Sequence, residues 1–196
     1  AFPWFCLAIA ANVHRMRNVA LTGQWRYLGW LVLFSVISEV PYRLFIDDAD
    51  TLNVLPTLAL GLLVARGWQQ KALVDRGLAL IALAIGAVFS TQLMFGFFGV
   101  LLPLAMLVVF RRPWYFSVLP GLLCVAANQW QILLDSGTPV ALMGLSACLL
   151  APLLGLVLLR HTQNTSPPAM RRWAYALYPA HFLLLLLVRE AIANPF

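Results

Sequence analysis

The sequence predicts an all-α membrane protein: a polytopic bundle of about eight transmembrane helices that forms a single integral membrane domain over residues 1–196. Of the 196 residues, 62% are hydrophobic and 10% are charged, whereas soluble domains are about half apolar and about a quarter charged. A soluble domain of this size needs more polar surface than these charges supply. The composition therefore excludes a disordered chain, a nucleic-acid-binding domain and an ordinary cytosolic enzyme.

Apolar runs that recur along the whole chain give the expected positions of the spans. We expect these spans at residues 1–13, 27–46, 52–67, 77–91, 93–110, 115–134, 139–159 and 173–190. Helices are required because backbone polar groups find no partner in lipid, and runs this continuous do not alternate as barrel strands do. Several runs are shorter than the roughly 20 residues that cross a bilayer core, so their ends extend into uncharged flanks.

The connections between these runs alternate in charge. Eleven of the 13 basic residues lie in the odd-numbered connections: Arg15, Arg17, Arg26, Arg66, Lys71, Arg76, Arg111, Arg112, Arg160, Arg171 and Arg172. By the positive-inside rule, these connections face the cytoplasm, and the acidic connection at residues 47–50 faces outward. The net charge of +6 thus indicates orientation in a cell membrane, and we expect no nucleic acid as a partner.

The same alternation divides the long apolar stretch at residues 77–110. Only Ser90, Thr91 and Gln92 interrupt this stretch. One long span there would reverse the side on which every later connection lies, so two separate spans are expected.

His181 lies about midway along the last expected span, at a depth where a polar group is costly and is a functional candidate. A neutral imidazole abstracts or shuttles a proton near pH 7. The alternative is a structural histidine that is hydrogen-bonded between helices. Pro179 frees a backbone carbonyl that is able to hold one nitrogen of the ring.

Glu39 and Arg43 are spaced i, i+4 near the outer end of their span. One interpretation is an ion pair within the helix that lowers the cost of insertion. The other is a carboxylate that faces a polar cavity and is tuned by the arginine. Asn53 begins the next span and is either a helix N-cap or a further member of this polar group.

Asn12, His14, Arg15 and Arg17 cluster at the expected cytoplasmic end of the first span. The arginines are either ordinary determinants of topology or ligands for phosphate oxygens. They join a positive rim that further includes Arg26, Arg66, Arg111, Arg112, Arg171 and Arg172. Such a rim attracts a polyphosphorylated donor such as coenzyme A, and it attracts anionic membrane lipid equally well.

No metal cofactor is expected. Cys6, Cys124 and Cys148 lie inside apolar stretches without metal-ligand spacing, so we interpret them as buried thiols that act as small hydrophobic side chains. The sequence also contains no phosphate loop, nucleophile elbow, zinc-protease motif or dinucleotide fingerprint.

Five segments, taken in order, resemble the TraX family, membrane proteins of conjugative plasmids that acetylate the N-terminus of F-type pilin. These segments are AFPWFCLAIAANVHRMRN (1–18), RYLGWLVLFSVISEVPYRLF (26–45), NVLPTLALGLL (53–63), FGFFGVLLPLAMLVVFRR (95–112) and YALYPAHFLLLLL (175–187). They match the family's AFPLF span with its basic loop, its Ser-Glu-aliphatic-Pro span, its Asn-aliphatic-Leu start, its aromatic-glycine span and its closing Tyr-Pro-x-His span. The ordered set covers nearly the whole chain.

The resemblance implies a polytopic acyltransferase of the bacterial inner membrane that uses acetyl-CoA and has a pilin subunit as its acceptor. The residues that carry over are Pro3, Asn12, Arg15, Glu39, Pro41, Asn53, Tyr178 and His181. Family members contain one more apolar segment with an Asp-His pair before the first motif. Because the chain begins without Met and within an apolar run, we expect it to be a fragment that lacks this segment.

The resemblance leads to a mechanistic hypothesis. His181 acts as the base or proton relay, Asn53 or Tyr178 donates to the oxyanion, and the arginines hold the coenzyme A phosphates. Because the pilin N-terminus lies outside and acetyl-CoA inside, the acetyl group passes between the helices, with Glu39 on this path. A small transporter or channel and a non-catalytic scaffold for pilus assembly are the competing functions, and a glycan hydroxyl is the alternative acceptor.

Overall fold

The computed structural model describes residues 2–16, 21–46, 48–70, 72–110, 112–128, 138–161 and 173–193. All regular secondary structure in these ranges is helical, which confirms the predicted all-α class. The helices are α1 (Phe2–Arg15), α2 (Leu21–Phe45), α3 (Val54–Gln69), α4 (Leu73–Val88), α5 (Gly96–Val109), the 3₁₀ helix η2 (Trp114–Ser117), α6 (Val118–Ala127), α8 (Pro139–His161) and α9 (Trp173–Ala193). Each of the eight expected runs contains an α-helix.

Two helical stretches within the described ranges, Trp25–Phe45 and Pro139–Leu159, are long and apolar enough to cross a membrane. The shorter apolar helices include α5, and α6 has only ten residues where the sequence predicts a span over 115–134. Residues 129–134 of that span lie outside the described part of the chain. The structure therefore supports a helical membrane bundle, and the number of eight spans stays a prediction.

The break predicted between residues 77–91 and 93–110 is present as a compact turn. Helix α4 ends at Val88, and α5 begins at Gly96, whose backbone has a positive φ of 55°. Glycine adopts this conformation without steric cost. The hydroxyl of Ser90 accepts a hydrogen bond of 2.9 Å from the backbone N–H of Phe97, so a predicted polar interruption fixes the start of α5.

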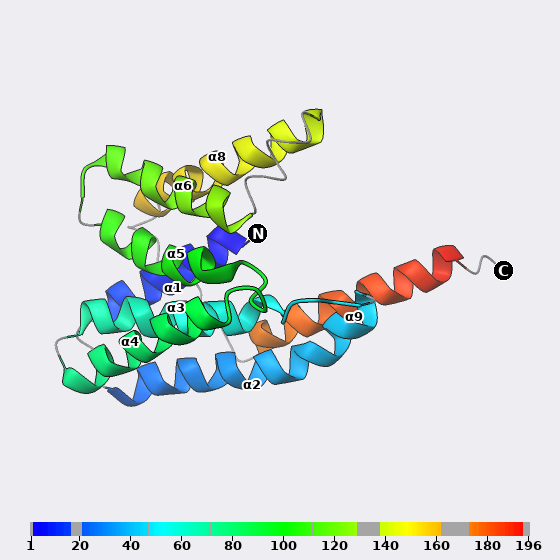
Figure 1. The fold of residues 1–196 in the computed structure, drawn as a ribbon, viewed down its shortest axis with the longest axis horizontal. Coiled ribbons are helices and arrows are strands. Elements are labelled where there is room, and N and C mark those ends of the chain that lie inside the picture. The colour runs from blue at the N-terminus through cyan, green and yellow to red at the C-terminus, as the bar shows by residue number, and fades with distance from the viewer. Residues whose placement is uncertain are drawn as a thin grey trace.

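The helices alternate in direction, as Figure 1 shows for α1 to α6. The last residues of α1, α3 and α5 therefore lie at the same end as the first residues of α2, α4 and α6. We call this end, which carries Arg15, Arg76 and Arg112, the basic end. The presence of these basic residues at one end agrees with the predicted charge alternation. The side of the membrane that the basic end faces stays a prediction.

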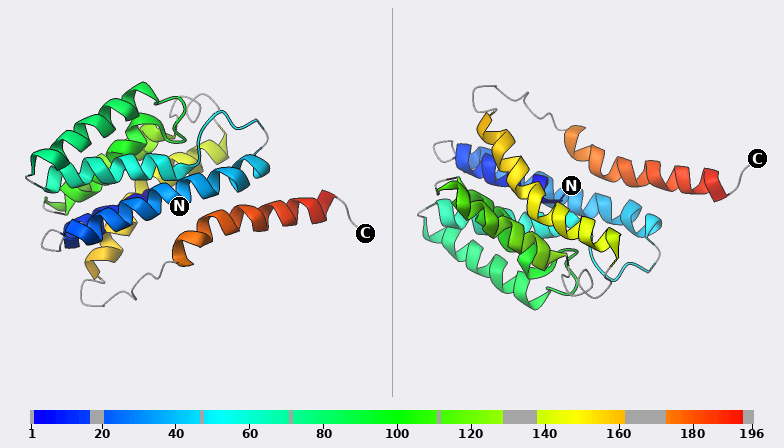
Figure 2. Two further views of the ribbon diagram at one scale, coloured as in Figure 1. Left: turned by 90° about the horizontal axis from the view of Figure 1, so that it is seen from below. Right: turned by 90° about the horizontal axis from the view of Figure 1, so that it is seen from above.

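The centre of the fold is formed by α1, α3 and α5, which contact one another. Figures 1 and 2 show α4 beside α3, α9 along α2, and α6 next to α8. Fully buried side chains such as Cys6, Leu102 and Met106 fill the centre. Gly61 allows α3 and α5 to approach closely, because a Cβ there would lie 2.7 Å from Cγ of Pro103.

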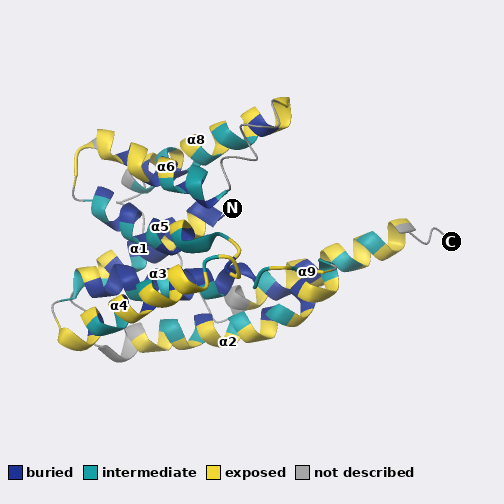
Figure 3. Ribbon diagram, viewed as in Figure 1, coloured by how far each residue is buried: buried dark blue, intermediate teal, exposed yellow. Residues whose placement is uncertain are grey.

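The outer helices carry many exposed residues (Figure 3), and a large share of these residues are large and apolar. Val140 on α8 is 77% exposed and Leu187 on α9 is 67% exposed, and many leucines near them are similarly open. A soluble monomer rarely exposes so much contiguous apolar surface. This surface is typical of helices whose outer faces contact lipid.

Candidate functional site

Asn53 is the centre of a polar cluster between α2 and α3. Its side chain is fully buried. The amide nitrogen Nδ2 donates to the backbone oxygen of Ser35 at 2.8 Å and to Oε2 of Glu39 at 2.7 Å. The amide oxygen Oδ1 accepts from the backbone N–H of Leu55 at 2.9 Å and caps α3. Asn53 is therefore an N-cap and a partner of Glu39 at the same time.

Glu39 has a donor on each carboxylate oxygen. Its Oε2 accepts from the backbone N–H as well as from Nδ2 of Asn53, and its Oε1 accepts from Nε of Arg43 at 2.7 Å. The side chain of Glu39 is 22% exposed, and that of Arg43 is 53% exposed. The carboxylate lies at the positive end of the α3 dipole. Its contacts therefore suit it to hold α2 against the start of α3.

Ser35 is the member of this cluster that the sequence analysis did not identify. It contributes its backbone oxygen, which no side-chain motif reveals. The spacing along α2 could have indicated that Ser35 belongs to the cluster, because Ser35 and Glu39 are four positions apart and lie on the same face of the helix.

Tyr178 connects this cluster to α9. Its hydroxyl oxygen accepts a hydrogen bond of 3.3 Å from the backbone N–H of Val54, the first residue of α3. Its ring stands edge-on to Phe182, with the centroids 5.2 Å apart. A phenol both accepts and donates, so the O–H hydrogen of Tyr178 is available for an acceptor.

His181 lies one turn after Tyr178 on α9, and its side chain is exposed. Its Nδ1 contacts the backbone oxygen of Tyr178, and its ring lies against Phe182 with centroids 4.0 Å apart. Within the described part of the chain, these contacts all come from α9 itself. The structure therefore gives His181 no hydrogen bond to another helix among the described residues, and its role stays a prediction.

The predicted phosphate-binding group lies at the basic end. Asn12 is half-buried, His14 is exposed with its ring edge-on to Phe110, and Nε of Arg15 donates to the backbone oxygen of Ala11 at 3.4 Å. Arg17 lies outside the described residues.

The phosphate-binding group and the Asn53 cluster are at opposite ends of the bundle. Helix α3 extends from the cluster to Arg66 at the basic end, a distance of about 20 Å at 1.5 Å per residue. Buried apolar side chains, among them Ile9, Leu58 and Leu62, fill the core between the two ends. The structure thus does not bring the two predicted groups together.

Arg66 does not belong to the positive rim that was predicted from the sequence. Only 4% of the residue is exposed, and its Nε lies 2.8 Å from Oδ1 of the equally buried Asp75. The guanidinium also lies over the ring of Trp25, 4.1 Å from its centroid. The correction follows from the helix bounds: α3 continues to Gln69 and α4 begins at Leu73, so both charges are inside helices rather than in a loop.

Comparison with known proteins gives one match. The family described as TraX protein matches the chain over residues 1–189. No curated protein and no solved structure matches the chain.

Proposed function

The chain belongs to the TraX family, and from this premise we propose that it is a membrane-embedded acyltransferase of bacterial conjugation. It transfers an acetyl group from acetyl-CoA to the N-terminal amine of a pilin subunit. The observation that carries the proposal is the exposed imidazole of His181, whose Nδ1 contacts the backbone oxygen of Tyr178, the residue whose hydroxyl accepts a hydrogen bond from the start of α3.

His181 acts as the general base. When Nδ1–H donates to the backbone oxygen of Tyr178, Nε2 carries the free lone pair and accepts the proton of the attacking amine. The bond from the amine nitrogen to the acetyl carbon forms, and the bond from that carbon to sulfur breaks. The coenzyme A thiolate then takes the proton from the imidazolium, so the imidazole returns to its neutral form.

Tyr178 stabilises the oxyanion in this proposal. Asn53 is a weaker candidate than the sequence suggested, because its two Nδ2 hydrogens are already donated to Ser35 and Glu39. The hydroxyl of Tyr178 accepts from Val54 and retains its own hydrogen for donation. Glu39 and Asn53 are therefore positioning residues that hold the start of α3, and with it the N–H of Val54, against the phenol.

Asn12, His14, Arg15 and Arg17 are proposed to hold the phosphates of acetyl-CoA at the basic end. Because apolar side chains fill the core between this end and Asn53, the route of the acetyl group lies beside that core rather than through it.

A non-catalytic scaffold for pilus assembly is the second candidate function. The apolar side chains that fill the core favour this function.

The test is N-terminal acetylation of pilin, measured by mass spectrometry in cells that express the full-length protein. We expect His181→Gln to abolish acetylation while the amount of membrane protein is unchanged. His161→Gln is the matched control for the base, because it removes a histidine at the end of α8 for which no role is proposed and leaves His181 in place. Unchanged acetylation in His181→Gln would contradict the role of His181 as the general base. If pilin stays unacetylated in cells that express the unaltered protein, this result would favour the non-catalytic scaffold.

A further inference from the structure

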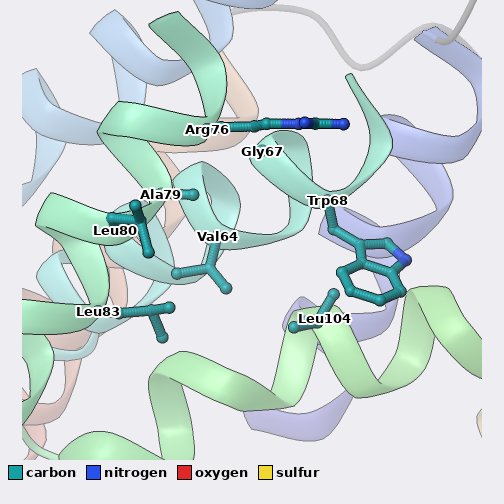
Figure 4. A pocket seen from close by; sticks show the side chains of 8 residues that line it. All are labelled: Val64, Gly67, Trp68, Arg76, Ala79, Leu80, Leu83 and Leu104. Carbon is teal, nitrogen blue, oxygen red and sulfur yellow. The ribbon is translucent and has the colours of Figure 1, made fainter. Parts of the chain in front are cut away.

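An apolar groove lies on the opposite side of α3 from the candidate site, between α3, α4 and α5. It has a volume of about 510 Å³, within the range of about 300–1,000 Å³ that is typical of small-molecule sites. Its walls are formed by Val64 on α3, Leu80 and Leu83 on α4, and Leu104 on α5, as Figure 4 shows. Nothing in the proposed acyl transfer uses this groove.

One end of the groove carries a cation. The Arg76 side chain extends across this end above Gly67 (Figure 4). Arg76 is exposed, and its guanidinium makes no ion pair or hydrogen bond with the described residues. The neighbouring carboxylate of Asp75 is already engaged by Arg66, so it does not neutralise Arg76.

The position of the groove matches the depth profile of a bilayer. Arg76 lies in the first turn of α4, and Trp68, which is 66% exposed, lies in the last turn of α3. Arginine and tryptophan at helix ends favour the headgroup region. Leu83 lies two turns deeper, about 10 Å from Arg76 along the helix. The groove thus runs from a charged mouth at headgroup level into the apolar part of the bundle.

We propose that this groove binds an anionic diacyl phospholipid, with its phosphate on Arg76 and one acyl chain between α3, α4 and α5. Charge complementarity selects the headgroup, because the guanidinium at the mouth pairs with none of the residues that the structure describes. The apolar walls select the chain. Basic pockets between membrane helices bind anionic headgroups in this way. The inference does not rest on the proposed acyltransferase activity.

Native mass spectrometry of the full chain in detergent tests the proposal. The probes are dioleoyl phosphatidylglycerol, dioleoyl phosphatidylcholine and glycerol 3-phosphate. We expect one tightly bound phosphatidylglycerol, weaker binding of phosphatidylcholine and no retention of glycerol 3-phosphate. Arg76→Gln should weaken phosphatidylglycerol binding about fivefold. Arg112→Gln is the matched control, because Arg112 is exposed at the same end and lies outside the groove.

A second variant tests the contribution of the acyl chain separately from that of the headgroup. Leu83→Trp fills the groove and leaves Arg76 in place, so this variant should not bind the lipid. If thermal melting shows that Leu83→Trp is unfolded, Leu80→Trp on the exposed edge of the groove is used instead. Equal affinity for both lipids, equal loss in Arg112→Gln, or binding that survives the tryptophan variant would overturn the proposal. A dimer that disappears in the tryptophan variant, without a lipid adduct, would assign the groove to a second copy and would overturn it as well.

Discussion

Glu39 and Asn53 join the end of α2 to the start of α3 through two hydrogen bonds to a single carboxylate oxygen. The Asn53 side chain donates at 2.7 Å and its backbone N–H donates at 3.1 Å. Because these bonds are part-buried and their acceptor is a carboxylate oxygen, they are stronger than neutral hydrogen bonds at a surface. This pair fixes where α3 begins and therefore where its N–H groups face Tyr178.

Asn53→Asp should destabilise the protein, although it keeps the cap acceptor for Leu55. The new carboxylate faces Glu39 and the backbone oxygen of Ser35, where two donated hydrogens are lost. We expect a loss of about 1–3 kcal/mol in the free energy of unfolding, measured by titration with sodium dodecyl sulfate. The double variant Asn53→Asp/Glu39→Gln should recover part of this loss, since the glutamine amide donates to the aspartate.

Arg43→Gln is the matched control for this experiment. The arginine pairs with the same carboxylate, but its side chain is half exposed, so we expect a change of less than about 1 kcal/mol. A loss in Arg43→Gln as large as that in Asn53→Asp would contradict the view that the buried amide, rather than the ion pair, secures the junction.

The sequence predicts the helices and the polar residues well, because both depend on local patterns. The recurring apolar runs predict each α-helix in the described part of the chain, and three uncharged polar residues predict the break before α5. The spacing of Glu39 and Arg43 gives their ion pair, which forms within one turn of one helix. These features need no knowledge of how distant segments pack.

Features that depend on packing between helices could not be predicted in the same way. The sequence places Arg66 in a basic connection, whereas the structure pairs it with Asp75 in buried positions on neighbouring helices. Asn53 appears able to donate to a substrate until its partners are known. The contact of Tyr178 with the start of α3 is a hydrogen bond between residues 124 positions apart, which no local pattern specifies.

Tyr178→Phe should lower pilin acetylation about 10²–10³-fold, because it removes the proposed oxyanion donor. The ring contacts with Phe182 are kept, so the thermal stability should change little. Tyr42→Phe is the matched control: its hydroxyl lies 3.2 Å from that of Thr51, its ring also packs on Phe182, and no catalytic role is proposed for it. Acetylation is measured by mass spectrometry of the pilin N-terminus. Equal activity in the two variants would count against the oxyanion role.

The buried pair of Arg66 and Asp75 predicts non-additive stability. Asp75→Leu leaves an unpaired buried guanidinium and should cost about 3–5 kcal/mol, as removal of one partner of a buried ion pair does. The double variant Arg66→Met/Asp75→Leu should recover most of this loss, since no charge stays buried. Unfolding in sodium dodecyl sulfate measures both values, and a double variant that is less stable than Asp75→Leu would show that the contact of Arg66 with Trp25 matters more than the ion pair.

Gly61→Ala should destabilise the centre of the bundle, because the added Cβ would lie 2.7 Å from Cγ of Pro103 and 3.0 Å from the backbone oxygen of Val100. Separation of α3 from α5 should cost about 1–3 kcal/mol. Gly77→Ala on α4 is the matched control, since its Cβ would meet nothing within 4 Å, and the better helix propensity of alanine should add up to about 1 kcal/mol. The two substitutions should thus shift the melting temperature in opposite directions. A rise in both would show that the close approach of α3 and α5 does not require a glycine.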